Sequence, residues 1–134
     1  PNKGYIMHSS VAYTAYSQNN VSIESPEKLI QMLYEGILRF TSFAKRAIED
    51  GNIEKKTYWI NRSTAIFSEL ITVLNYDNGG ETAYYLRGLY THQIWLLGQA
   101  ALLNETQKLD EVLHVTKELL QAWKEETHDT AMDE

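Results

Sequence analysis

Four long stretches of this sequence repeat apolar residues at steps of three and four, the spacing that places side chains on one face of an α-helix. These stretches cover roughly residues 26–50, 54–76, 81–103 and 107–127. Only a few residues separate each stretch from the next, and connections this short force neighbouring helices to run antiparallel. The pattern therefore predicts an all-α fold, an antiparallel up-down four-helix bundle.

Local signals indicate where these helices begin and end. Ser25 can cap the first helix by accepting hydrogen bonds from free backbone N–H groups, and Pro26 suits the first helical position because it has no N–H. Gly51 can end the same helix in the left-handed conformation. Residues 77–80, Asp-Asn-Gly-Gly, predict a tight turn in which both glycines are free to adopt a positive φ.

A chain of 134 residues fits a single domain. We expect its two ends, residues 1–10 and 127–134, to be disordered tails. Residues 11–16 can form one or two helical turns before Asn19 and Asn20 end them. This piece is expected to lie against the bundle as a short N-terminal helical or extended cap segment.

Composition excludes several classes of function. The chain has no cysteine, so disulfides, thiolate metal sites and cysteine nucleophiles are ruled out. Its net charge is −6 and its basic residues are scattered, which argues against binding to nucleic acid or to an anionic membrane. No apolar run is long enough for a transmembrane helix, and residues 1–4 carry no secretion signal. We therefore expect a cytoplasmic location.

Two motifs raise the alternative of a metal-binding four-helix bundle, because di-iron bundles use Glu-x-x-His. The motifs are Glu111-x-x-His114 and Glu125-x-x-His128, and both fall on the last helix, on the stripe opposite its apolar row. A histidine-phosphotransfer bundle, using His92 or His114, is the other alternative. No catalytic arrangement is evident, so we expect neither an enzyme, nor a metal site, nor a cofactor.

Aromatic residues are more numerous than a bundle of this size needs: nine Tyr, three Trp and three Phe. Some fall on the inward rows, but others lie beside or opposite them. The latter include Tyr58, Trp59, Tyr84, Tyr85 and Trp95. Exposed aromatic surface commonly marks a partner site, and a bundle with spare apolar grooves can accept an amphipathic helix. The residues thus favour a helix-binding protein.

The sequence also resembles a known family, the flagellin-specific export chaperones, or FliS family. The resemblance is strongest in two adjacent blocks, Ser25-Pro26-Glu27-Lys28-Leu29-Ile30 and Met32-Leu33-Tyr34-Glu35-Gly36-Ile37. Later matches are Leu74-Asn75-Tyr76, Gly79-Gly80-Glu81 and Leu120-Gln121-Ala122-Trp123. Together they extend over roughly residues 11–126.

This resemblance implies a cytosolic chaperone that binds the disordered C-terminal region of flagellin. Such a chaperone prevents premature polymerisation and assists delivery to the flagellar type III export apparatus, without a cofactor. The flagellin groove is expected along the first long helix, at Leu29, Ile30, Leu33, Tyr34, Ile37 and Leu38. The cap over that groove is expected to use Tyr13, Tyr16 and Val21. The aromatic group of Tyr58, Trp59, Tyr84, Tyr85 and Trp95 could serve a second partner, such as a co-chaperone, a flagellar assembly factor or an export gate component.

Overall fold

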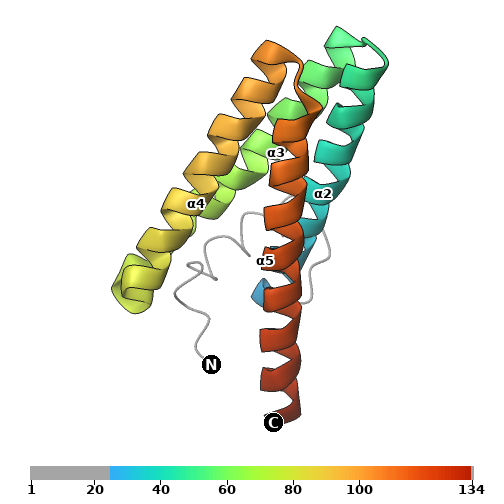
Figure 1. Ribbon diagram of the computed structural model, residues 1–134. Helices are drawn as coiled ribbons and strands as arrows, with labels where there is room; N and C mark the ends of the chain where they lie inside the picture. Colours follow the sequence, from blue (N-terminus) through green and yellow to red (C-terminus); the bar gives the residue numbers. More distant parts are fainter. Residues whose placement is uncertain (1–24, 134) are drawn as a thin grey trace.

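The computed structural model describes residues 25–133, and these residues form four α-helices. The helices are α2 (Pro26–Glu49), α3 (Ile53–Thr72), α4 (Tyr76–Leu103) and α5 (Thr106–Asp133). Consecutive helices run in opposite directions along a common axis (Figure 1). The predicted all-α four-helix bundle is confirmed.

The helices are arranged so that each one packs against two neighbours. α2 packs against α3 and α5, and α4 packs against the same two helices on the other side. The predicted apolar rows supply most of the core between them. The largest fully buried side chains are Tyr34, Tyr90, Phe67, Leu29, Ile30, Ile37, Leu70, Leu74, Leu97, Leu109, Gln93 and Val112. Because burying one large apolar side chain contributes about 1.5–3 kcal/mol, this core is the main stabilising feature of the bundle.

The first described helix begins and ends where the sequence predicts. The Ser25 side chain accepts a hydrogen bond from the backbone N–H of Lys28 at 3.1 Å, and Pro26 occupies the first turn. After the C-cap residue Asp50, Gly51 adopts a left-handed conformation with φ of 69°. A side chain at Gly51 would be strained there, which is why the helix stops at a glycine.

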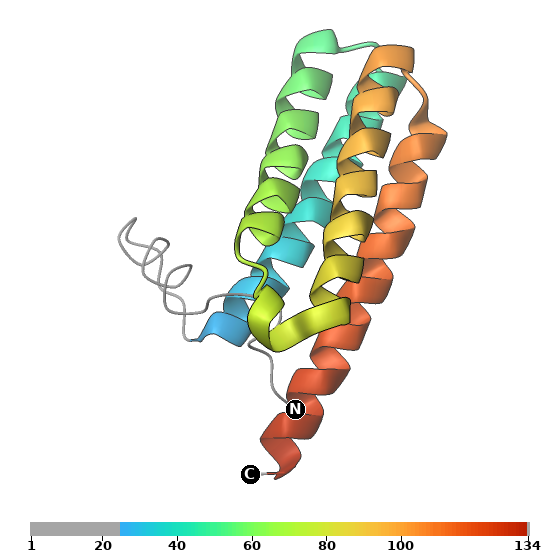
Figure 2. The same cartoon turned by 90° about the vertical axis from the view of Figure 1, so that its left-hand side faces the viewer.

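The prediction for residues 77–80 is confirmed at Gly80, where the chain breaks with a positive φ, but the residues just before it are helical and belong to α4 rather than to a tight turn. α3 ends at Thr72, and Asn75 caps α4 by accepting a hydrogen bond from the backbone N–H of Asn78 at 3.1 Å. Gly80 has φ of 50° and ψ of −128°, so α4 bends there. Figure 2 shows the short piece before this bend lying across the end of the bundle.

The two ends of the chain differ in how far the structure describes them. α5 continues to Asp133, so the backbone of residues 127–133 is helical where a disordered tail is predicted. The expected N-terminal tail, residues 1–10, lies outside the described residues. So does the expected cap segment with Tyr13, Tyr16 and Val21.

Polar bonds between helices add to the apolar core. The Tyr34 and Tyr90 hydroxyls lie 2.6 Å apart and join α2 to α4. On the surface, the Lys45 ammonium donates to Asp110 of α5 at 2.9 Å. This hydrogen bond, together with the charge of Asp110, raises the pKa of Lys45 above its ordinary value.

Candidate protein-binding surface

The six residues predicted to line a flagellin groove do not form one open surface. Ile30, Tyr34 and Ile37 are buried in the core, and the Tyr34 hydroxyl is bonded to Tyr90. Helical periodicity places Tyr34 beside the inward row, but in the bundle α4 covers it. The half-buried Leu38 lies on the side of α2 that faces α5, one heptad before Lys45. Of the predicted set, Leu29 and Leu33 reach a groove.

That groove, which we call the α2–α3 groove, runs between α2 and α3 and has a volume of ≈ 690 Å³. It is lined by Leu29, Met32, Leu33, Gly36, Arg39, Phe40, Arg62, Ala65, Ile66 and Glu69. Gly36 allows the two helices to come close, since a Cβ on this residue would lie 3.1 Å from Ile66 Cδ1. The floor is aliphatic, whereas Arg39 and Arg62 border the end of the groove where Phe40 lies.

An aromatic cluster, consisting of Phe40, Phe43, Tyr58 and Trp59, lies at one end of the α2–α3 groove. Trp59 is its centre: the Trp59 ring centroid is 5.3 Å from that of Phe40, 4.8 Å from that of Phe43 and 4.7 Å from that of Tyr58. The guanidinium groups of Arg39 and Arg62 lie 5.0 and 4.8 Å from the Phe40 ring centroid. Such cation–π contacts hold the arginine side chains against the rings, with the charge still facing the solvent.

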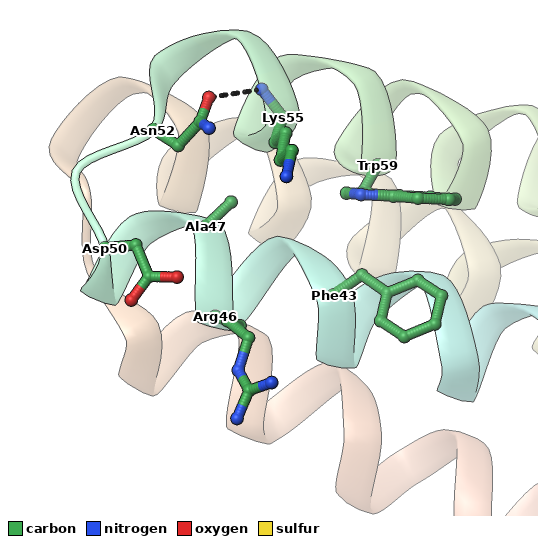
Figure 3. Close-up of a pocket in the computed structure, with 7 residues that line it drawn as sticks. All are labelled: Phe43, Arg46, Ala47, Asp50, Asn52, Lys55 and Trp59. Carbon is green, nitrogen blue, oxygen red and sulfur yellow. Dashed lines mark hydrogen bonds between the residues drawn. The ribbon is translucent and has the colours of Figure 1, made fainter.

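Beyond the aromatic cluster, near the connection from α2 to α3, is a second hollow, which we call the turn pocket. Its volume is ≈ 260 Å³, and its lining residues are Phe43, Arg46, Ala47, Asp50, Asn52, Lys55 and Trp59. Figure 3 shows Phe43 and Trp59 side by side at one end of the pocket, with Lys55 next to Trp59. The α2–α3 groove, the aromatic cluster and the turn pocket thus follow one another along the same pair of helices.

The five aromatic residues predicted as a second partner surface are not gathered in one place. Tyr58 and Trp59 belong to the aromatic cluster on α3. Tyr84 and Tyr85 are exposed near the start of α4, at the other end of the bundle. Trp95 is exposed between α4 and α5, where it stacks on His92 with a centroid distance of 5.6 Å. These side chains therefore present three separate aromatic patches.

The stripe of acids and histidine on the last helix is exposed, as its position opposite the apolar row predicts. Its members are Glu111, His114, Glu118, Gln121 and Glu125. His114 Nε2 lies 2.8 Å from a Glu118 carboxylate oxygen, one turn along the same helix. Within the described part of the chain, no three His, Cys, Asp or Glu side chains come together in a group that could hold a metal ion. None of the helices described there is long and apolar enough to cross a membrane.

The arginines and Met32 on the α2–α3 groove are functional candidates that the predicted set does not include. They belong to two stripes that face each other across the groove and the turn pocket. The stripe on α2 and its C-cap consists of Met32, Gly36, Arg39, Phe43, Arg46 and Asp50, and the stripe on α3 consists of Lys55, Trp59, Arg62, Ile66 and Glu69. Each stripe advances by steps of three and four, so both can be found in the sequence. The prediction missed these stripes because it considered only rows of apolar residues, and both stripes also contain arginine or lysine.

Comparisons with known proteins show the family to which the chain belongs. The family described as flagellar protein FliS matches residues 8–130 of this chain. The flagellar secretion chaperone FliS of Campylobacter jejuni is 56% identical over 119 residues, which is 89% of this chain and 93% of the relative. The protein of the same name from Bacillus subtilis is 34% identical over 84% of both chains, and that from Vibrio cholerae is 31% identical over 78% of this chain and 77% of its own. The chain therefore belongs to the FliS family of flagellar secretion chaperones.

Proposed function

We propose that this chaperone binds the disordered C-terminal region of flagellin in the cytoplasm. Binding keeps flagellin from polymerising before export and helps to deliver it to the flagellar type III export apparatus. Family membership supports the role in flagellar export. The α2–α3 groove on the surface of the bundle supports a ligand that binds as an amphipathic helix.

The observation that carries the proposal is the α2–α3 groove. An amphipathic helix is recognised when its apolar face fills a hydrophobic groove, and a disordered segment can form such a helix on binding. The groove has an aliphatic floor that includes Leu29 and Leu33, and the partly exposed Met32 stands beside it. From Met32 to Phe43 the groove and the aromatic cluster extend over about 17 Å of α2, at 1.5 Å per residue. A flagellin helix of three turns matches this length.

The N-terminal residues Tyr13, Tyr16 and Val21 are proposed to cover part of the groove in the free protein. Flagellin would then have to displace them. A covering segment would also protect the apolar floor from non-specific contacts, since exposed apolar patches promote association. Removing residues 1–24 is expected to strengthen binding of the flagellin segment, as measured by calorimetry, and weaker binding after the deletion would contradict this role.

The test of the proposed function is calorimetry with a peptide from the C-terminal region of the cognate flagellin. The informative variant is Met32→Asp, because Met32 is 39% exposed and its replacement leaves the core intact. Leu102→Asp is the matched control, since Leu102 is 74% exposed at the end of α4, away from the groove. We expect Met32→Asp to weaken binding about tenfold or more, as loss of an anchor residue does, and Leu102→Asp to leave it unchanged. Wild-type binding weaker than millimolar, or normal binding by Met32→Asp, would refute the proposal.

A further inference from the structure

We propose that the turn pocket holds the free C-terminal carboxylate of the bound flagellin segment, together with its last apolar side chain. The inference rests on the proposed function and adds to it the direction in which the segment lies. The helix in the α2–α3 groove would run parallel to α2. Its last residue would then meet the connection between α2 and α3.

The apolar half of the turn pocket is suited to a terminal side chain. Phe43 is 42% exposed, Trp59 is half-buried, and their ring centroids are 4.8 Å apart. Ala47, a small residue, lies between the helices and leaves space beside the rings (Figure 3). An aliphatic or aromatic side chain entering this space would be removed from water on two sides, as at the centre of a binding interface.

The polar half of the turn pocket is suited to a carboxylate. Arg46 lines it from α2 and Lys55 lines it from α3, against a single acid, Asp50. Among residues 25–128, neither Arg46 nor Lys55 forms an ion pair. The Asn52 side-chain oxygen is already engaged, because it accepts a hydrogen bond from the backbone N–H of Lys55 at 3.0 Å. In a chain of net charge −6, this pocket is therefore locally basic.

Charge also distinguishes the two ends of the path that the segment would follow. Glu69 lines the α2–α3 groove near the end of α3, whereas Arg46 and Lys55 line the turn pocket. A bound helix carries partial positive charge at its N-terminus and partial negative charge at its C-terminus. With the C-terminus in the turn pocket, both ends face charges of opposite sign, and the free carboxylate adds a full charge that arginine can bind with two hydrogen bonds.

The length of the path agrees with one continuous helix. Met32 and Ala47 are fifteen residues apart on α2, or about 22 Å at 1.5 Å per residue. A segment of about fifteen residues would thus reach from the α2–α3 groove to the turn pocket. It would cross the aromatic cluster on the way, where Phe40 and Trp59 stack with a centroid distance of 5.3 Å.

The experiment compares two peptides of identical sequence, the C-terminal segment of the cognate flagellin with a free carboxylate and the same segment with a C-terminal amide. Both are titrated by calorimetry into the wild-type chain and into Arg46→Gln/Lys55→Gln. The control is Arg87→Gln/Lys117→Gln, which removes one exposed arginine and one exposed lysine from α4 and α5. All the substituted residues are exposed, and circular dichroism confirms that each variant is folded.

We expect the amide to bind the wild-type chain about five- to tenfold more weakly than the free acid, since a charge-assisted hydrogen bond is lost. The same penalty should appear in the control variant and disappear in Arg46→Gln/Lys55→Gln. If both peptides bind the wild-type chain equally well, the proposed function stands but this inference is refuted. If the penalty persists in Arg46→Gln/Lys55→Gln, the carboxylate lies elsewhere and the placement is wrong. If neither peptide binds, both proposals fail.

Discussion

Lys56 affects the stability of the bundle in two opposing ways: its ammonium forms hydrogen bonds that stabilise the fold, but burying its charge is unfavourable. Its side chain is buried, with the residue only 8% exposed. The ammonium donates to the backbone oxygen of Ala101 at 2.9 Å and to Asn104 Oδ1 at 2.7 Å. Asn104 is the left-handed C-cap of α4, with φ of 56°. One lysine on α3 therefore holds the end of α4.

The perturbation is Lys56→Met, which keeps a long unbranched side chain and removes the ammonium. A hydrogen bond that involves a charged group contributes about 1.5–3 kcal/mol, and the terminal carbonyls of a helix have no partner within the helix. The burial of the ammonium opposes this gain, because a charge removed from water costs several kcal/mol unless it is fully paired. Two short bonds compensate much of that cost, so we expect the free energy of unfolding to fall by about 1–3 kcal/mol.

The assay is urea unfolding followed by circular dichroism, which gives the free energy of unfolding by linear extrapolation. Lys55→Met is the matched control, since Lys55 is the exposed neighbour of Lys56 and loses the same charge. This control should stay within about 0.5 kcal/mol of the wild type, as exposed substitutions usually do. If Lys56→Met is as stable as the wild type or more stable, desolvation of the ammonium outweighs its two bonds and the reasoning is refuted.

Three further predictions follow from local geometry. Ser25→Ala removes the side chain that accepts a hydrogen bond from the Lys28 N–H, and it should lower the free energy of unfolding by about 1 kcal/mol in urea titrations. An unchanged free energy of unfolding would show that this cap is not formed. Gly36→Ala places a Cβ 3.1 Å from Ile66 Cδ1, which narrows the α2–α3 groove and should weaken peptide binding in calorimetry. Alanine itself favours the helix by about 1 kcal/mol, so the variant should stay folded. An unaltered affinity would show that the peptide does not bind in this part of the groove. Asp110→Asn should lower the pKa of Lys45 towards 10.5, as measured by NMR titration, and an unmoved pKa would contradict the ion pair.

The raised pKa of Lys45 fixes the pH range in which its pairing with Asp110 matters. Because the charged lysine is favoured in the folded chain, the pair supports folding at neutral pH. This support is lost as the pH rises through the folded pKa of Lys45, which lies above 10.5. Lys45 is half-buried at the surface and open to solvent on one side, so salt should weaken the effect.

The bundle could be predicted from the sequence because the residues of the apolar rows form its core. Leu29, Ile37 and Ala44 recur at helical spacing, and all three are buried. The break at Gly80 was predicted as a turn, but the helical turn that precedes it, from Tyr76, was not. Asn75 and Gly80 are typical of turns, but Asn75 here caps a helix, and local side-chain bonding allows either outcome.

The candidate binding surface was less predictable, because exposure depends on which neighbour covers each side of a helix. Tyr34 and Ile37 satisfy the pattern of a groove residue, yet packing against the rest of the bundle buries them. Arg39 and Arg62 satisfy the pattern of a solvated surface, yet both lie over the Phe40 ring and border the α2–α3 groove. Sequence periodicity shows which residues lie on the same side of a helix, but it does not show which other helix packs against that side.

The central claim is that flagellin binds along α2 and α3, and NMR tests it most directly. The ¹⁵N-labelled chain is titrated with the C-terminal peptide of the cognate flagellin, and backbone amide shifts are followed. We expect the largest changes at residues that line the α2–α3 groove and the turn pocket, among them Met32, Arg62 and Lys55. Changes confined to the α4–α5 face, around Leu89 and His114, or no change up to millimolar peptide, would contradict the claim.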